Sequence, residues 1–196
     1  MTNSHLVKLS KFMALVLRHQ PERFGLPVDD EGWAPLAEVM SILHELPNFR
    51  WATRADVMRV VEEGSGDDRR RFEVDAQGQR IRARYGHTLA QPIHYAPCNP
   101  PARLYHATSP QAVDAIRREG LKPMSRQYVH LFADPAPASA AGTHHADPPV
   151  VLSVRAADAH AAGVIFYRAD DVVYLAGYVP PEFLDWPTTK RDDSRG

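Results

Sequence analysis

The chain has 196 residues, 44% hydrophobic and 24% charged, which is enough to form one large globular domain or two small ones. No apolar run approaches the ~20 residues needed to cross a bilayer, and the single cysteine, Cys98, excludes an internal disulfide and a cysteine-based zinc site. The N-terminal MTNSHLVKLS lacks a signal-peptide pattern, so a cytoplasmic location is expected, and the net charge of −1 means that any RNA site must be a local cluster.

The N-terminal half predicts three helices and a hairpin. Apolar residues at helical spacing over 6–17 indicate a first helix, which ends before Pro21. A second helix is expected to begin near Pro35, and a third after Thr53, whose side chain can form a capping box with Asp56. Alternating apolar residues over 72–83 predict a β-hairpin. This order of elements is typical of a winged helix.

The C-terminal half is mixed and strand-rich. Residues 92–102 contain several prolines and are interpreted as a linker. After a short strand, a helix is expected to open at Ser109 and close at Gly120, and further strand-like runs follow. The predicted fold class is α+β, with lobes at 1–91 and 103–187 and a polar tail at 188–196.

The pair Arg18-His19 stands at the end of the first helix. In isolation, it would be interpreted as a solvated arginine and a histidine near the last carbonyls of a helix. Two further arginines change that interpretation, because Arg71 begins a strand and Arg126 immediately precedes another. Arginine forks match phosphate oxygens, so these four residues form a reasonable set for a phosphate dianion.

Three other segments carry weaker signals. The YHATS run at 105–109 leads from a strand into a helix and could receive a phosphate or a ribose hydroxyl, although it could equally be an ordinary strand–turn–helix. The GHT run at 86–88 offers hydrogen bonds, but a loop histidine is usually just solvated. Six arginines gather within 69–84. The histidines match no metal-ligand spacing, so no metal is expected.

Five segments together resemble one family. LSKFMALVLRHQPERFGLPVDDEGW, RRRFEVDAQGQRIRARYGHT, LYHATS, GLKPMSRQYVHL and GYVPPEFL occur in the order seen in KptA-type RNA 2′-phosphotransferases, across roughly residues 5–185. The resemblance implies an N-terminal winged-helix, RNA-binding lobe and a C-terminal ADP-ribosyltransferase-like, NAD-binding lobe. It implies no metal.

The resemblance also implies a reaction with NAD as co-substrate. The RNA 2′-phosphate attacks C1″ of the nicotinamide ribose and expels nicotinamide. The ribose O2″ then attacks that phosphate, which releases RNA with a free 2′-OH and ADP-ribose 1″,2″-cyclic phosphate. The family's catalytic tetrad falls on Arg18, His19, Arg71 and Arg126. The arginines suit an anionic transition state, and the histidine suits acid–base work.

The remaining site residues follow from the same resemblance. The expected NAD-binding residues are His106, Ala107, Thr108, Ser109, Ser125 and His130. The expected RNA-binding residues are Arg69, Arg84, His87 and Thr88. The partner is expected to be a 2′-phosphorylated, tRNA-like RNA, as in tRNA splicing, and the protein is expected to be a monomer.

The chain departs from the family's usual pattern near both substrates. Ala107 replaces a glycine and adds a Cβ beside the expected dinucleotide, and Phe132 replaces a serine. Arg84-Tyr85 stands where the family has Asn-Gln. Because the tetrad is intact, the resemblance implies retained catalysis with altered NAD or RNA affinity.

Three alternatives remain open. The same site could ADP-ribosylate terminal phosphates of RNA or DNA and stop after the first step. A non-catalytic winged-helix regulator is disfavoured, because the third predicted helix carries acidic residues among its arginines. A protein-modifying ADP-ribosyltransferase would need a Glu-x-Glu motif on the late strands, which the sequence lacks.

Overall fold

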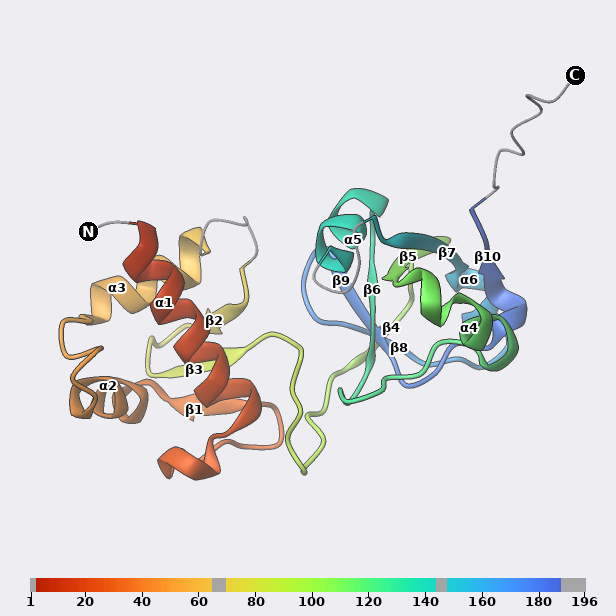
Figure 1. Cartoon of the computed structure of the whole chain (residues 1–196). Helices are drawn as coiled ribbons and strands as arrows, with labels where there is room; N and C mark the ends of the chain where they lie inside the picture. The colour runs from red at the N-terminus through yellow and green to blue at the C-terminus, as the bar shows by residue number, and fades with distance from the viewer. Residues whose placement is uncertain (1–2, 65–69, 144–147, 188–196) are drawn as a thin grey trace, which may run out of the picture. The chain divides into compact units, whose positions relative to one another are not determined.

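The computed structural model describes residues 3–64, 70–143 and 148–187. It contains helices and antiparallel sheets, which confirms the predicted α+β class. The chain divides into two compact units (Figure 1). The first unit comprises Met1–His94 with Ser125–Gln127, and the second comprises Tyr95–Met124 with Tyr128–Gly196. The short segment Ser125–Gln127 therefore lies with the N-terminal half, although its neighbours in sequence lie with the C-terminal half.

The first unit contains the predicted helices and hairpin, with additions. Its elements are α1 (Asn3–Ala14), η1 (Leu15–His19), η2 (Glu22–Phe24), β1 (Trp33–Pro35), α2 (Leu36–Glu45), α3 (Arg54–Glu63), β2 (Phe72–Val74) and β3 (Arg80–Ala83). The strands form an antiparallel sheet in the order β1-β3-β2. The predicted capping box at the start of α3 is confirmed, since Thr53 and Asp56 each accept from the other's backbone N–H.

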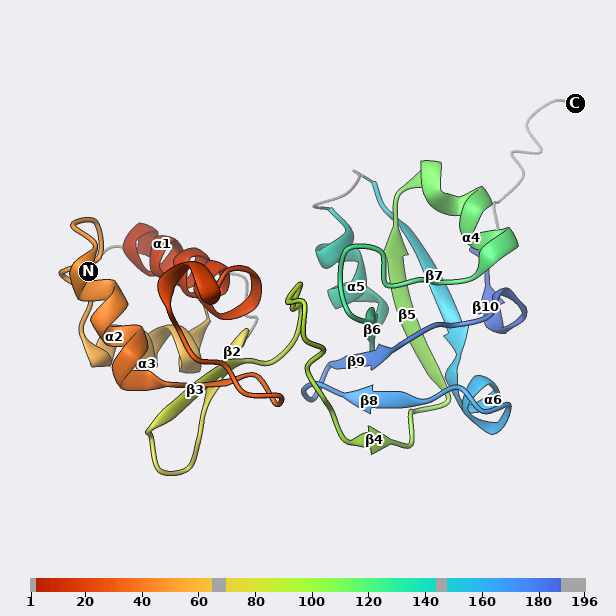
Figure 2. The same ribbon diagram turned by 90° about the horizontal axis from the view of Figure 1, so that it is seen from below.

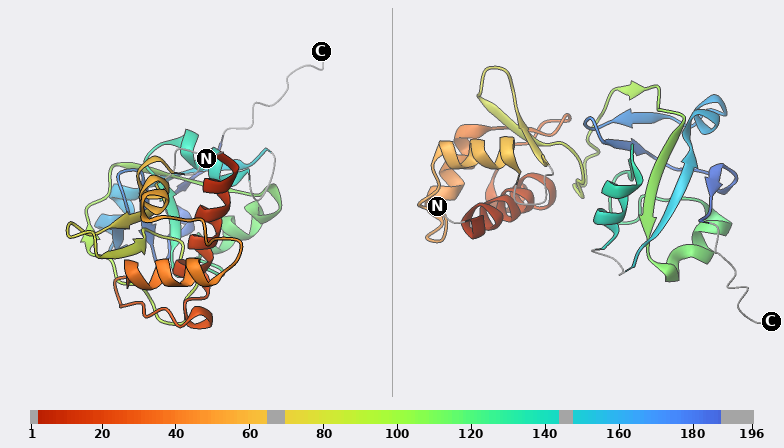
Figure 3. Two further views of the ribbon diagram at one scale, coloured as in Figure 1. Left: turned by 90° about the vertical axis from the view of Figure 1, so that its left-hand side faces the viewer. Right: turned by 90° about the horizontal axis from the view of Figure 1, so that it is seen from above.

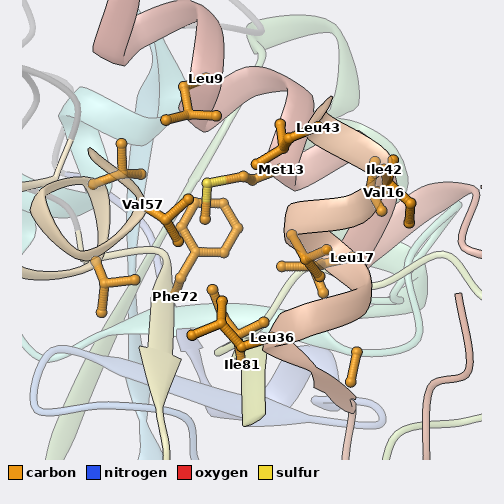
Figure 4. Close-up of a cluster of buried hydrophobic side chains, with 14 of the residues drawn as sticks. Leu9, Met13, Val16, Leu17, Leu36, Ile42, Leu43, Val57, Phe72 and Ile81 are labelled. Carbon is orange, nitrogen blue, oxygen red and sulfur yellow. The ribbon is translucent and has the colours of Figure 1, made fainter. Parts of the chain in front are cut away.

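The three helices cover the sheet with one continuous core. Apolar residues of α1, α2 and α3 meet Phe72 of β2 and Ile81 of β3, and both of these side chains are fully buried (Figure 4). Met13, Leu17 and Leu43 are equally buried in this cluster. Burying a side chain of this size contributes ~1.5–3 kcal/mol. This core therefore fixes η1, the turn that carries Arg18 and His19.

The second unit is built on a larger sheet. Its elements are β4 (Pro97–Cys98), β5 (Arg103–Thr108), η3 (Pro110–Ala112), α4 (Val113–Glu119), β6 (Val129–Phe132), α5 (Pro135–Gly142), β7 (Val150–Arg155), α6 (Ala156–Ala161), β8 (Phe166–Arg168), β9 (Val173–Ala176), η4 (Pro181–Phe183) and β10 (Leu184–Asp185). The strand order is β10-β7-β5-β6-β9-β8-β4, and all neighbours are antiparallel. Figure 2 shows β5 and β7 side by side in the middle of the second unit.

The two faces of β5 point into different surroundings. Leu104 lies in the main core of the second unit with Leu131 and Leu152. Ala107, which strand alternation places on the opposite face, lies against Gly142 of α5. Helix α5 packs along β5 and β7 on that side (Figure 3, right). The alternation therefore separates Ala107 from its neighbours His106 and Thr108.

One stretch differs from the sequence prediction, and another lies outside the described residues. Within the expected linker 92–102, Pro97–Cys98 form β4 and pair with β8, so part of this stretch belongs to the sheet. The proposed tail 188–196 lies outside the described residues. Across the described ranges, no helix is long and apolar enough to cross a membrane.

Candidate functional site

Arg18 and His19 lie on a π-helical turn that the sequence did not reveal. The turn spans Leu15–His19 and continues directly from α1. Its residues Val16 and Leu17 are buried in the core, which leaves Arg18 half-buried and His19 exposed. Such turns are rare in proteins and are often found at functional sites. The core thus anchors the turn that carries both residues.

The Arg18 guanidinium is held by the end of the hairpin. Its Nη2 donates to the carbonyl of Arg71 at 3.3 Å. Its Cζ lies 5.7 Å from the ring centroid of Phe72 and 5.3 Å from that of Tyr85, distances at which a cation interacts favourably with an aromatic face. A Cβ at Gly86 would lie 3.4 Å from Nη1 of Arg18. Glycine at 86, with φ +86°, permits this close approach.

Thr88 connects the same loop to His19. Its backbone N–H donates to the carbonyl of Arg18 at 3.0 Å. Its Oγ1 lies 2.9 Å from Nδ1 of His19 and forms a hydrogen bond with it. This pair of contacts fixes the orientation of the imidazole and directs Nε2 away from Thr88. Thr88 thus contacts the catalytic candidate directly, whereas it was predicted to contact RNA.

His87 is buried beneath this loop. Only 2% of its surface is exposed, and a Cβ at Gly32 would lie 3.4 Å from its Nε2. Burial, aided by the nearby charge of Arg18, lowers the pKa of His87 to about 3. The imidazole is therefore neutral at physiological pH and out of reach of solvent. Its predicted contact with RNA stays a prediction, which would require the loop to move so that the ring becomes exposed.

Arg126 brings a further positive charge to His19. It belongs to the segment Ser125–Gln127, which lies with the first unit. Partial desolvation of the imidazole, and then the charges of Arg18 and Arg126, lower the pKa of His19 below its usual value. The tetrad members are thus all in the first unit. Ser125, predicted to bind NAD, lies in this segment as well.

Gln127 is a residue that sequence reasoning missed. Its side-chain amide donates to the carbonyls of Leu89 and Gln91 at 2.9 and 2.7 Å and accepts from the N–H of Ile93 at 2.9 Å. These contacts attach the Ser125–Gln127 segment to the chain just after Thr88. Nothing in the sequence marks Gln127 except its position next to Arg126.

Much of the predicted arginine cluster is paired with carboxylates. Arg82 and Arg84 both pair with Glu73, and Arg80 pairs with Asp75 at 3.1 Å. Arg84 also donates to the carbonyl of Phe72. These pairs reduce the positive charge available to RNA. Arg69, another predicted RNA contact, lies outside the described residues.

The predicted NAD residues of the second unit cluster around the end of β5. Nδ1 of His106 lies 2.9 Å from the carbonyl oxygen of His130. Thr108 is buried, and Ser109 precedes η3 without making a capping hydrogen bond. The side chain of Ala107 faces α5, where a Cβ at Gly142 would lie 2.6 Å from its own Cβ. The methyl group of Ala107 therefore fills a space left by a glycine, and its place beside a dinucleotide stays a prediction.

Phe132 also packs into the protein. It is 7% exposed and pairs with Tyr105 and Val173 on neighbouring strands.

As for metals, within the described ranges no group of three or more His, Cys, Asp or Glu side chains could hold an ion. His144 and His145 lie outside those ranges.

The first unit therefore brings the guanidinium groups of Arg18 and Arg126 near the imidazole of His19. Comparison with known proteins shows the family to which the chain is related. Residues 4–177 match the family described as RNA 2′-phosphotransferase, Tpt1 / KptA family. The chain belongs to this family, which confirms the resemblance deduced from the sequence.

Named relatives extend over nearly the whole chain. The chain is 42% identical to a probable RNA 2′-phosphotransferase of Pectobacterium carotovorum, over 94% of this chain and 97% of that protein. It is 41% identical to one of Streptomyces griseus, over 94% and 98%, and 44% identical to one of Pseudomonas aeruginosa, over 89% and 93%. These names support an enzyme that acts on RNA 2′-phosphates.

Proposed function

We propose that this protein removes an internal 2′-phosphate from RNA in an NAD-dependent reaction. The phosphate is transferred to ADP-ribose, and the products are RNA with a 2′-OH, nicotinamide and ADP-ribose 1″,2″-cyclic phosphate. The observation that carries the proposal is the gathering of Arg18, His19 and Arg126 in the first unit, with Arg71 bound to Arg18 through its carbonyl. Family membership supports the same reaction class.

The arginines would bind the phosphate. A guanidinium stays charged at all physiological pH values and presents its N–H groups in a fixed fork that matches two phosphate oxygens. The Arg18 side chain is already ordered by Arg71, Phe72 and Tyr85. Binding therefore costs less side-chain entropy than ordering a free arginine, which costs up to ~2 kcal/mol. Preorganised cations of this kind also stabilise charge that develops during transfer.

His19 would move the proton. Its lowered pKa keeps the imidazole neutral near pH 7, so that it can accept a proton from a hydroxyl. The hydrogen bond to Thr88 holds Nδ1 and leaves Nε2 for substrate. A bound phosphate dianion would raise the pKa of His19 again, because an opposite charge favours the protonated ring. The same residue can therefore act first as a base and then as an acid toward the departing RNA oxygen.

The second unit offers polar groups that suit NAD. His106, Thr108 and Ser109 supply an imidazole and two hydroxyls around the end of β5, the kinds of group that hold ribose hydroxyls and phosphates. When bound, NAD supplies the ribose carbon that accepts the phosphate as nicotinamide leaves. His130 and the backbone of Ala107 complete the proposed set, and no metal is part of it.

The proposal also assigns roles to the two units. We propose that the helices and hairpin of the first unit form a winged-helix, RNA-binding lobe, because three helices pack on a small antiparallel sheet. The larger sheet of the second unit would be an ADP-ribosyltransferase-like, NAD-binding lobe. The substrate class is 2′-phosphorylated, tRNA-like RNA, and we propose a monomer that acts in the cytoplasm.

A product analysis tests the proposal against transfer to a terminal phosphate. The protein is incubated with NAD and with matched oligoribonucleotides that carry either an internal 2′-phosphate or a 5′-phosphate. We expect the 2′-phosphorylated RNA alone to lose its phosphate, with the cyclic ADP-ribose phosphate as co-product. A stable ADP-ribosylated RNA, without the cyclic product, would favour the terminal-phosphate reaction instead.

A further inference from the structure

Arg126 reaches the first unit on a very short piece of chain. Ser125–Gln127 lie with the first unit, while Met124 and Tyr128 on either side lie with the second. So short a segment has no core of its own, and its position depends on the contacts it makes. Other contacts must therefore hold the Arg126 guanidinium close enough to His19 to influence the pKa of the imidazole.

The side chain of Gln127 makes contacts that hold this segment in place. Its amide group donates to the carbonyls of Leu89 and Gln91 and accepts from the N–H of Ile93, all between 2.7 and 2.9 Å. Both ends of the amide are used, so neither a shorter amide nor an apolar side chain could replace it.

The backbone just before the segment also depends on contacts with its surroundings. Met124 has φ +56°, the one non-glycine residue with positive φ in the described part of the chain. Its side chain is 88% exposed, so packing of that side chain does not hold the turn. A non-glycine residue in this region is strained and persists only where the surroundings enforce it. The Gln127 hydrogen bonds attach the chain three residues after this turn, and the backbone pairing of Leu121 with Val179 attaches it three residues before.

We propose that Gln127 is a positioning residue that holds Arg126 beside His19. It acts on the reaction only through Arg126. This inference deepens the proposed function and rests on it for the effect on catalysis, but the placement of Arg126 is open to a test that needs no substrate.

The test measures the titration of His19 by NMR in the full-length protein. The charged and titratable groups around His19 are Arg18, Arg126 and His87, and Thr88 holds its Nδ1. Gln127→Met keeps the size and neutrality of the side chain but removes all its hydrogen bonds. Once Arg126 is released, we expect the pKa of His19 to rise, in the same direction as in Arg126→Ala. Gln77→Met, at an exposed turn of the hairpin, is the matched control and leaves the titration unchanged.

A double variant separates positioning from general damage. In the Arg126→Ala background, Gln127→Met should cause no further shift, because the charge it would displace is already gone. An unchanged His19 titration in Gln127→Met, or an equal shift in both backgrounds, overturns the inference. On 2′-phosphorylated RNA, Gln127→Met should lower kcat/KM about tenfold, since displacing a substrate-contacting group has effects of this size. Wild-type protein inactive on that RNA would instead contradict the proposed function and leave the titration test standing.

Discussion

Replacing the buried His87 should remove a large part of the acid sensitivity of the first unit. In the folded protein the pKa of His87 is about 3, against 6.5 for an ordinary histidine. Between these values the unfolded chain binds a proton that the folded chain excludes, so the free energy of unfolding falls as pH falls. Each pH unit costs ~1.4 kcal/mol, so that His87 alone lowers stability by ~2 kcal/mol between pH 6.5 and 5.

Urea unfolding at pH 7 and pH 5 measures this effect. In a Trp186→Phe background, fluorescence of Trp33 and Trp51 follows the first unit, because Trp186 is the tryptophan of the second unit and the other two lie in the first. His87→Asn and His87→Phe should each lose ~2 kcal/mol less than the wild type on acidification. Gln77→Asn, at an exposed and uncharged position in the turn of the hairpin, is the control and keeps the wild-type pH dependence. An identical pH dependence in wild type and both His87 variants would refute the reasoning.

Three further predictions address the tetrad and the second unit. Arg126→Ala should lower 2′-phosphate removal at least ~100-fold in a steady-state assay with an unchanged circular-dichroism spectrum; near-wild-type turnover would remove Arg126 from the site. The kcat/KM of the wild type should fall with decreasing pH, with a midpoint below 6.5 set by His19, and a midpoint above it would contradict the assigned cause. Gly142→Ala would place a Cβ 2.6 Å from Ala107 and 2.7 Å from Pro149, and so should lower the free energy of unfolding in urea by ~1–3 kcal/mol. Adding Ala107→Gly should restore part of the lost stability, and no recovery would mean that Pro149 alone is the obstacle.

Local patterns predicted the parts of the fold that local forces determine. The helical spacing over 6–17, the capping box of Thr53 and Asp56, and the hairpin around Asp75–Gly78 all act within a few residues. The sequence also identified Arg18 and His19 as a pair worth attention. Each of these features could be deduced because its partners lie close together in the chain.

Features that depend on distant partners were missed. The π-helical turn at Leu15–His19 gives no distinct sequence signal, and β4 lies in a proline-rich stretch that has no alternation of its own. The orientation of Ala107 depends on a glycine far along the chain. The pairing of Arg84 with Glu73 likewise requires knowledge of the sheet register. Gln127 was overlooked because the three backbone groups to which it hydrogen-bonds lie 34 to 38 residues earlier in the chain.

The destination of the phosphate tests the central claim most directly. An RNA that carries a radiolabelled internal 2′-phosphate is incubated with the protein in the presence and absence of NAD, and the labelled products are separated. The account predicts that all released label appears on ADP-ribose as the cyclic phosphate, and only when NAD is present. Label released as inorganic phosphate, or released without NAD, would contradict it.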